Sequence, residues 1–267
     1  MELTRRELLG SLGGLAIGAA IGGVGTRQVF GATKEEAPAL PWPYKKLDPK
    51  AAAAAAYEGY GKAGCCYGAF LGVIDGLAKK VGAPYTTIPT ELWIVGEGGM
   101  AGTGNLCGAL NGAAYAIFLT AGGMEKEKRE EAFAIIQDLF HWYEQTKLPI
   151  YTPKKAILYD GKIVKSISGS TLCHVSVTNW CKVSGFKSFS AARSERCGRL
   201  TADVVAHTVE LLNKDFAGAF KRGFALSAAA QGCRDCHDKG SELENTRGIM
   251  ECGQCHFNLG TKHPEVK

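Results

Sequence analysis

Two copies of the pattern Cys-x-x-Cys-His lie close together near the end of the sequence. In c-type haem attachment, the two thiols of such a motif add to the vinyl groups of the porphyrin, and the histidine binds the iron as its proximal ligand. One copy could arise by chance, whereas two neighbouring copies predict two covalently attached haems. The attachment cysteines and proximal histidines are Cys233, Cys236, His237, Cys252, Cys255 and His256.

The same four cysteines also fit the spacing of a zinc ribbon, Cys-x2-Cys-x15-Cys-x2-Cys. A ribbon does not require a histidine after each second cysteine, whereas His237 and His256 are both present. Disulfides within the Cys-x-x-Cys pairs are the other alternative. Haem attachment is favoured because it takes place outside the cytoplasm, where the first residues of the sequence direct the protein.

Those first residues, 1–31, are typical of an export signal. Arg5 and Arg6 precede an uncharged, glycine-rich stretch over residues 8–25. A twin-arginine pair before a weakly apolar run is typical of the Tat route, which exports folded proteins. A transmembrane anchor is the alternative, which the glycine content disfavours. We expect cleavage near Gly31 or Ala32, a periplasmic protein, and no membrane span in the mature chain.

Composition narrows the function classes further. Of the 267 residues, 46% are apolar and 21% are charged, which excludes a disordered chain and a polytopic membrane protein. The net charge of +5 comes with no basic stripe, so no nucleic-acid partner is expected. The 10 cysteines are too many for an ordinary cytosolic enzyme. No Ser/His/Asp arrangement, paired acidic motif or Walker sequence indicates hydrolysis.

Apolar periodicity predicts a mainly α-helical protein. We expect helices over residues 51–81, 107–118, 126–147 and 196–213. The third of these is expected to bury Phe133, Ile136, Phe140 and Tyr143. Residues 156–167 are expected to form a small hairpin whose turn is Asp160-Gly161.

The sequence divides into four parts. The signal occupies residues 1–31, and residues 32–56 read as a Pro- and Ala-rich linker or an arm across a partner. Residues 57–231 form the helical domain. In residues 232–267 the apolar periodicity disappears, which predicts a short irregular or helical segment that carries both haems.

Six further cysteines lie in the predicted helical domain, and the sequence must also explain what their sulfur atoms bind. Thiolates gathered from several segments suit an iron–sulfur cluster. Structural disulfides and inert buried thiols are the alternatives. The six are Cys65, Cys66, Cys107, Cys173, Cys181 and Cys197.

The element Cys107-Gly108-Ala109-x-x-Gly112 and its neighbours resemble the C_GCAxxG_C_C family of redox-active proteins over about residues 57–213. With two haem motifs appended, the sequence is similar to the split-Soret cytochromes c. The resemblance implies a mostly helical homodimer with two c-type haems and an iron–sulfur site per subunit. It implies that the cluster ligands are Cys66, Cys107, Cys173 and Cys197, and we favour a [2Fe–2S] cluster. The family pattern does not need both Cys65 and Cys66, and it does not account for Cys181.

Two haems with two axial histidines each require distal ligands. We expect these to be His207, which shares an apolar stripe with Leu211, and His263, which is badly placed for its own haem and could reach a neighbouring haem or a second subunit. A core histidine is the alternative for His207. The reserves are His174, next to a cluster cysteine, and His141, expected to be exposed or at an interface.

The predicted function is electron transfer by an exported dihaem cytochrome c with an additional iron–sulfur cluster. Six-coordinate irons leave no open position for a substrate, so we expect a carrier rather than an enzyme, with no catalytic residues. Its partners would be redox proteins and a second copy of the chain, because the haem segment has too few apolar residues to bury two porphyrins. The alternatives are a reductase of a small oxidant such as nitrite or peroxide, and a structural metal-binding or cofactor-delivery protein.

Overall fold

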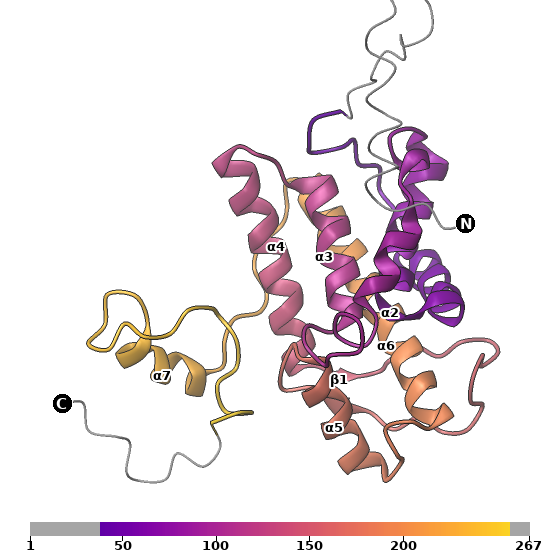
Figure 1. The fold of residues 1–267 in the computed structure, drawn as a ribbon. Coiled ribbons are helices and arrows are strands. Elements are labelled where there is room, and N and C mark those ends of the chain that lie inside the picture. The colour runs from indigo at the N-terminus through magenta and orange to yellow at the C-terminus, as the bar shows by residue number, and fades with distance from the viewer. Residues whose placement is uncertain (1–37, 257–267) are drawn as a thin grey trace, which may run out of the picture. The chain divides into compact units, whose positions relative to one another are not determined.

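The computed structural model describes residues 38–256 and confirms the mainly α class (Figure 1). The predicted signal and His263 lie outside the described residues. Within the described part of the chain, no helix combines the length and the apolar character of a membrane span. The elements are α2 (Pro49–Val81), η1 (Tyr85–Thr87), η2 (Thr90–Gly96), α3 (Gly108–Ala121), α4 (Lys126–Gln145), β1 (Lys147–Leu148), β2 (Ser166–Ile167), α5 (Cys173–Ser184), α6 (Ala191–Phe216) and α7 (Ala228–His237).

Local sequence signals set the ends of α2, the longest of these helices. The side chain of Asp48 accepts a hydrogen bond from the Lys50 backbone N–H at 2.9 Å, and Pro49 stands at the first helical position. Gly82 ends the helix with a φ of 83°, which a glycine adopts without strain. The predicted helix over residues 51–81 is therefore confirmed, with two further residues at its start.

A kink interrupts α2 just before its two adjacent cysteines. Ala63 has a φ of −153° and Gly64 a φ of 80°, so the helix is broken for one residue pair and then resumes. A Cβ atom on Gly64 would lie 2.7 Å from the Glu97 side chain. Glycine is required here both by the positive φ and by the close contact. The kink sets the directions in which Cys65 and Cys66 leave the helix.

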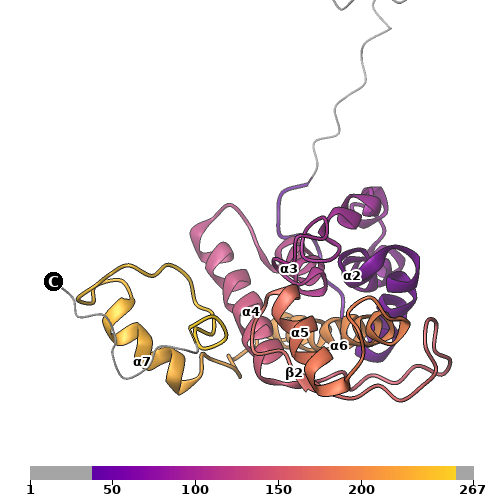
Figure 2. The same ribbon diagram turned by 60° about the horizontal axis from the view of Figure 1, so that its bottom comes forward.

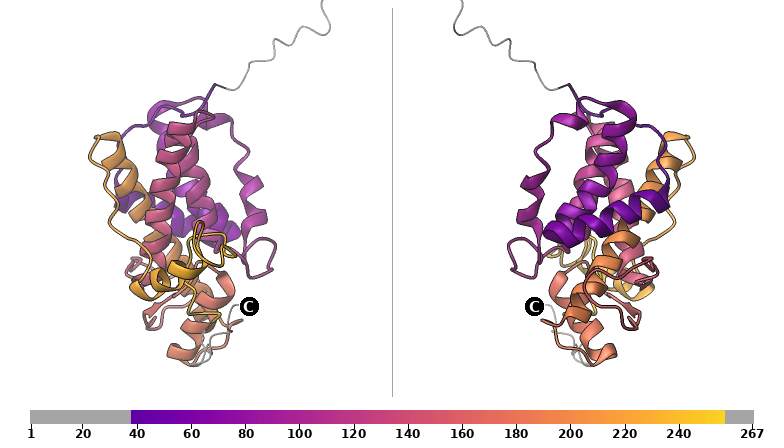
Figure 3. Two further views of the ribbon diagram at one scale, coloured as in Figure 1. Left: turned by 90° about the vertical axis from the view of Figure 1, so that its left-hand side faces the viewer. Right: turned by 90° about the vertical axis from the view of Figure 1, so that its right-hand side faces the viewer.

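The core forms where α2 packs against α3 and α6 (Figures 1 and 2). Phe70 and Val73 of α2 meet Leu110 of α3 and Val205 of α6 in one cluster of fully buried side chains. The side views in Figure 3 show the same helices from opposite sides. This packing brings residues near 65, 107 and 197 to one region of the molecule.

The buried face of α4 differs from the predicted one. Tyr143 is buried as expected, but Phe133 is 45% exposed. Ile135 and Leu139 are buried where Ile136 and Phe140 were expected. The reason is polar: Asp138 is also buried, because its carboxylate accepts hydrogen bonds from the backbone N–H groups of residues 223 and 224. A prediction that assigns every charged residue to solvent therefore puts the buried face of such a helix in the wrong position.

The small antiparallel hairpin is present, but its strands lie elsewhere than predicted. Leu148 of β1 pairs with Ser166 of β2, and no strand occupies residues 156–165. The backbone N–H groups of that segment bond instead to helix side chains. Ile157 donates to the Tyr57 hydroxyl at 2.9 Å, and Leu158 donates to Glu195 at 3.1 Å. These side-chain acceptors replace the strand partners that a hairpin at Asp160-Gly161 would supply.

The segment before α2, expected to be a linker or an arm, lies against the helices of its own chain. The Trp42 backbone N–H donates to the Leu119 carbonyl at 2.8 Å, and the Tyr44 hydroxyl donates to Asn213 at 3.0 Å. Leu47 is 6% exposed. Residues 38–48 thus cover the ends of α3 and α6.

Candidate metal centre and haem attachment motifs

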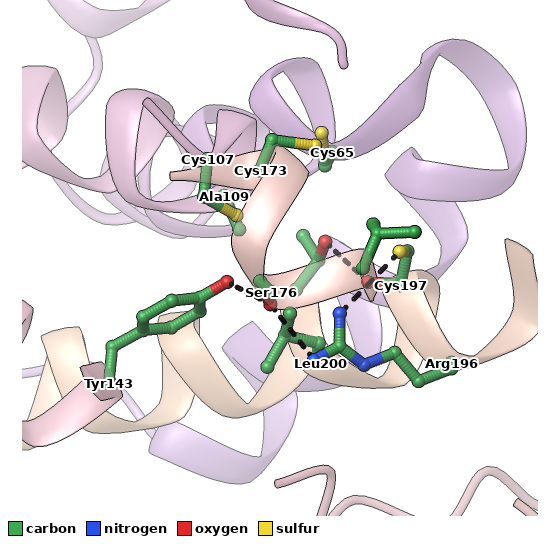
Figure 4. Close-up of a pocket in the computed structure, with 11 residues that line it drawn as sticks. Cys65, Cys107, Ala109, Tyr143, Cys173, Ser176, Arg196, Cys197 and Leu200 are labelled. Carbon is green, nitrogen blue, oxygen red and sulfur yellow. Dashed lines mark hydrogen bonds between the residues drawn. The ribbon is translucent and has the colours of Figure 1, made fainter. Parts of the chain in front are cut away.

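Four cysteines from four different segments surround one pocket (Figure 4). Cys65 follows the kink of α2, Cys107 immediately precedes α3, Cys173 begins α5, and Cys197 lies near the start of α6. The remaining walls are apolar or come from four polar side chains, those of Tyr143, Ser176, Arg196 and Thr201. All four thiols are free.

Backbone hydrogen bonds fix two of these cysteines side by side. The Cys107 N–H donates to the Thr171 carbonyl at 2.9 Å, and the Cys173 N–H donates to the Asn105 carbonyl at 2.7 Å. The two segments therefore run antiparallel at this point. Each cysteine then begins or caps a helix, so both thiols stand at helix N-termini, where positive partial charges favour thiolates.

The glycines of the Cys-Gly-Ala-x-x-Gly element allow α3 to approach α2. A Cβ on Gly108 would lie 2.3 Å from the Cys65 sulfur, and a Cβ on Gly112 would lie 2.2 Å from the Cys66 carbonyl oxygen. Real Cβ atoms never come so close to other atoms, so both positions require glycine for the helices to pack as they do. The spacing of four residues places the two glycines on one face of α3.

Cys66, expected as a cluster ligand, does not line the pocket. It is 1% exposed and belongs to the apolar stripe of α2, and a Cβ on Gly96 would lie 2.3 Å from its sulfur. The structure thus brings Cys65 to Cys107, Cys173 and Cys197, the other three predicted ligands. Consecutive residues of a helix point about 100° apart, so Cys65 can line the pocket while Cys66 stays in the apolar stripe.

The four thiols interact electrostatically across the pocket. The pKa of the Cys65 thiol is well above its ordinary value, first because of burial and then because of Cys107, Cys197 and Cys173. Burial and the same neighbours raise the pKa of Cys173 to about 12. For Cys107, burial raises the pKa and a hydrogen bond with Tyr143 opposes the rise. Because the pKa values of Cys65, Cys107 and Cys173 are raised, these three thiols stay protonated at neutral pH without a metal, and metal binding would release their protons.

The donor set fits a thiolate-ligated iron–sulfur group. Four cysteine thiolates are the usual ligands of such clusters, and soft thiolate ligands favour them. Among residues 38–256, no three His, Cys, Asp or Glu side chains converge as they would around a single ion. The thiols therefore surround a space instead of one point. Cys181 lies on α5 and does not line this pocket.

The first Cys-x-x-Cys-His motif ends α7. Cys233 and Cys236 are three residues apart on this helix, so their exposed thiols point to the same side. His237 is the last residue of the helix, and its Nδ1 atom lies 2.7 Å from the Asn245 side-chain oxygen. A hydrogen bond from Nδ1 is the arrangement that directs the Nε2 atom of a ligating histidine to a metal.

The second motif forms a turn beside α5. The backbone N–H of His256 donates to the Cys252 carbonyl at 3.1 Å. Between them, the Gln254 side chain accepts a hydrogen bond from Asn179 of α5 at 3.2 Å and lies against Gly169. The helix that begins with Cys173 therefore contacts the second haem motif about 9 Å further along its axis.

His207, expected as a distal ligand, is enclosed by aromatic rings. Its imidazole stacks on Trp142 with the centroids 4.2 Å apart, and the edge of Phe224 lies on another side. Its Nδ1 atom is 3.3 Å from Glu210, while its buried Nε2 atom has no hydrogen-bond partner. Burial lowers the pKa of His207, which keeps the imidazole neutral and able to bind a metal.

The two reserve histidines differ in burial. His141 was expected to be exposed or at an interface, and this was wrong about its exposure: it is 4% exposed and pairs with the buried Glu144 at 3.2 Å. The same polar burial that misled the prediction for α4 is responsible, since Asp138, His141 and Glu144 follow each other at helical spacing. His174 is exposed on α5, beside Cys173.

Comparisons with known proteins agree with these features. Residues 72–211 match the family described as "Putative redox-active protein (C_GCAxxG_C_C)". The chain is 38% identical over 271 residues to the split-Soret cytochrome c of Desulfovibrio desulfuricans (strain ATCC 27774), covering 96% of this chain and 95% of that protein.

A solved structure is also similar to this one. It is described as "A novel iron centre in the split-Soret cytochrome c from Desulfovibrio desulfuricans ATCC 27774", with a TM-score of 0.77 and 39% identity. The similarity covers 83% of this chain and 92% of that one. The four-segment cysteine pocket and the paired haem motifs thus occur in a chain that belongs to the split-Soret cytochrome c family.

Proposed function

We propose that this protein is an exported electron-transfer cytochrome that carries two c-type haems and one cysteine-ligated iron–sulfur cluster. The convergence of four thiols on one pocket, in a chain with two Cys-x-x-Cys-His motifs, is the observation that carries this proposal. The family supports it, because the related protein is a cytochrome c and the description of its structure names an iron centre.

The cluster ligands in this proposal are Cys65, Cys107, Cys173 and Cys197. When bound, a [2Fe–2S] cluster of this kind supplies a site that takes up and releases one electron. The protein contributes four thiolates on four rigid segments, two helix N-termini and a wall that excludes water. Cys66 stays a core side chain of α2.

The haems in this proposal are attached through Cys233 and Cys236, and through Cys252 and Cys255. They supply one-electron redox chemistry at potentials set by axial ligands and burial. Here the histidine that follows each second cysteine would bind its iron, and the Asn245 contact would orient the first of them. For the distal positions we keep His207, whose buried Nε2 atom lacks a partner, and His263.

A short connection between the two kinds of centre supports electron transfer. Cys173 opens α5, and Asn179 of the same helix bonds to Gln254 inside the second haem motif. Helix α5 therefore ties a cluster ligand to a haem segment by a rigid element about 9 Å long. This connection supports the proposal that a cluster and a haem held here would exchange electrons with each other and with a partner protein.

Location and assembly complete the proposal. The twin-arginine signal supports export of a folded protein that already contains its cluster, with haem attachment afterwards in the periplasm. The haem segment supports assembly as a homodimer, because no apolar side chain is buried among its described residues, 232–256. Two porphyrins need more apolar cover than this segment supplies.

Optical and elemental analysis of protein purified without oxygen tests the proposal. We expect two haems per chain, two further irons and acid-labile sulfide. The haem and cluster signals should change reversibly between the oxidised and reduced protein. A low-spin spectrum that does not change with carbon monoxide indicates a carrier. Rapid reoxidation by nitrite or peroxide with multiple turnovers would favour the reductase instead. Protein with haem but no further iron would refute the cluster.

A further inference from the structure

Arg196 of α6 is a buried cation without an anionic side chain beside it. The residue is 1% exposed, and none of the ion pairs among residues 38–256 includes it. Its guanidinium lies at the wall of the four-cysteine pocket (Figure 4). A buried charge that lacks a partner is strongly unfavourable, so a counter-charge is expected close by.

The hydrogen-bond partners of Arg196 are neutral or sulfur. One terminal nitrogen, Nη2, donates to the Ser176 hydroxyl at 3.0 Å, and the other, Nη1, lies 3.9 Å from the Cys197 sulfur. The Nε atom is buried without a partner. The Ser176 oxygen also accepts from Tyr143 at 2.8 Å, so its own hydrogen is left for Ser168. This network orients the guanidinium but leaves its charge uncompensated.

The carboxylates of α6 are committed elsewhere. Glu195 precedes Arg196 in the sequence, but it accepts hydrogen bonds from Tyr57, Leu158 and Arg199 on a different side of the helix. Asp203 lies two turns further on, about 10 Å along the axis. Both of its oxygens accept backbone N–H groups, those of residues 150 and 151. Asp203 does interact electrostatically with Arg196, but this is the smallest of the causes that act on the pKa of Asp203. The guanidinium itself lines the cysteine pocket.

We propose that Arg196 is the counter-charge of the cysteine-ligated centre and a positioning residue for Cys197. The inference rests on the proposed function, because the anion that it requires is the set of deprotonated, metal-bound thiolates. A fixed positive charge in a site of low dielectric stabilises the more negative, reduced state of such a centre. Arg193 also lies near Cys197 but is only half-buried, so solvent weakens its contribution.

This role makes opposite predictions for the two states of the protein. With the metal bound, removal of the charge disfavours the reduced state. Without the metal, the anionic centre that the charge would offset is absent and the same charge is buried unpaired, so its removal stabilises the fold. A merely structural arginine would stabilise both states alike through its bond to Ser176. The contrast between the states therefore separates the two roles.

The test compares full-length Arg196→Gln and Arg196→Lys with the wild type. Glutamine is neutral and can still donate to Ser176, whereas lysine keeps the charge. Lys182→Met removes an exposed cation of α5 and is the matched control. Redox titration followed by electron paramagnetic resonance gives the midpoint potential of the cluster. After anaerobic chelation, denaturant titration gives the stability of the metal-free chain, in which the haems stay covalently attached.

For Arg196→Gln we expect a lower cluster potential, by about a tenfold change in the redox equilibrium, or about 59 mV for one electron. The haem potentials should move less. The metal-free variant should unfold at a higher denaturant concentration than the wild type. Arg196→Lys and Lys182→Met should keep a cluster potential close to the wild-type one.

Two results would contradict the inference in distinguishable ways. A wild type that contains no iron besides haem overturns the proposed cluster, and with it the need for a counter-charge. A loaded Arg196→Gln variant with an unchanged cluster potential overturns the role of Arg196 alone. If Arg196→Gln does not retain a cluster, the metal-free measurement decides: a loss of stability there shows a structural arginine and refutes the proposal.

Discussion

The sulfur of Cys65 and the α-carbon of Gly108 are in direct van der Waals contact across the interface of α2 and α3. A single added methyl group at position 108 would come within 2.3 Å of that sulfur. The candidate metal centre and the helix interface are thus one packing unit. Gly108, which is not itself a candidate metal ligand, therefore decides whether Cys65 can occupy its position in the pocket.

Gly108→Ala should therefore remove non-haem iron while leaving both haems attached. The added methyl group overlaps the Cys65 sulfur and the Gly96 carbonyl oxygen, which forces the helices apart at a cost of about 1–3 kcal/mol. Gly76→Ala is the control, because there the nearest atoms belong to the flexible side chain of Leu47. Iron and haem analysis of both variants checks the prediction. A Gly108→Ala protein with normal iron content would contradict it.

Serine substitutions at the two adjacent cysteines should have opposite outcomes. Cys65→Ser removes a thiol from the pocket and should lower non-haem iron and acid-labile sulfide severalfold. Cys66→Ser leaves the pocket intact and should keep the cluster, although a hydroxyl in the core costs about 1–3 kcal/mol of stability. Iron and sulfide assays under anaerobic conditions provide the measurement. The reverse result would restore Cys66 as the ligand.

The choice between Cys65 and Cys66 shows what could not be predicted from the sequence alone. Apolar spacing predicted α2 correctly and placed Cys66 on its buried stripe, which the structure confirms. The family resemblance then implied that Cys66 is a cluster ligand. The proposed site uses Cys65 instead, which lines the pocket, and hydrophobic periodicity does not show which of two adjacent cysteines faces a pocket.

Polar burial limits sequence-based prediction in the same way. The helix α4 was predicted with nearly its observed ends, but Phe133 was expected on its buried face and His141 was expected to be exposed or at an interface. Asp138 is buried because the N–H groups of residues 223 and 224 donate to it, and His141 is buried beside Glu144 of the same helix. The hairpin was misplaced for a related reason, since Tyr57 and Glu195 hold residues 157 and 158. Long-range partners of this kind leave no local pattern.

Removing the first haem motif should leave the cluster and the second haem in place. In Cys233→Ala/Cys236→Ala the thiols that attach one porphyrin are absent, whereas Gln254 still contacts α5. Intact-mass spectrometry of the denatured protein should show two haem additions for the wild type and one for the variant. Haem loss from both motifs would show that the first attachment is needed for the second. An unmodified wild-type mass would refute haem attachment altogether.

Asp203 should make stability depend on pH between about 4 and 6. Burial raises the pKa of its carboxyl to about 6, above its ordinary value, and the N–H groups of residues 150 and 151 only partly oppose this. The folded state therefore favours the protonated form, so its stabilising contribution is complete below pH 4 and is lost as the pH rises through 6. The loss should be roughly 2–3 kcal/mol.

Asp203→Asn isolates this contribution, because all other groups titrate in both proteins. The difference in unfolding free energy between wild type and variant should change with pH over that window and be constant above about pH 7. Denaturant titrations at several pH values in the metal-free state give the measurement. Parallel pH curves for the two proteins would contradict the raised pKa.

The spread of the four pocket cysteines along the chain has a kinetic consequence. Cys65 lies in the first described helix, and Cys197 lies in α6, after the whole of α3, α4 and α5. Contacts between such distant positions close long loops, and the entropy of loop closure makes them form late in folding. During synthesis, the pocket remains incomplete until the ribosome has released α6. Every truncated or stalled chain that ends before Cys197 thus lacks a wall of the pocket and, with it, the means to retain a cluster.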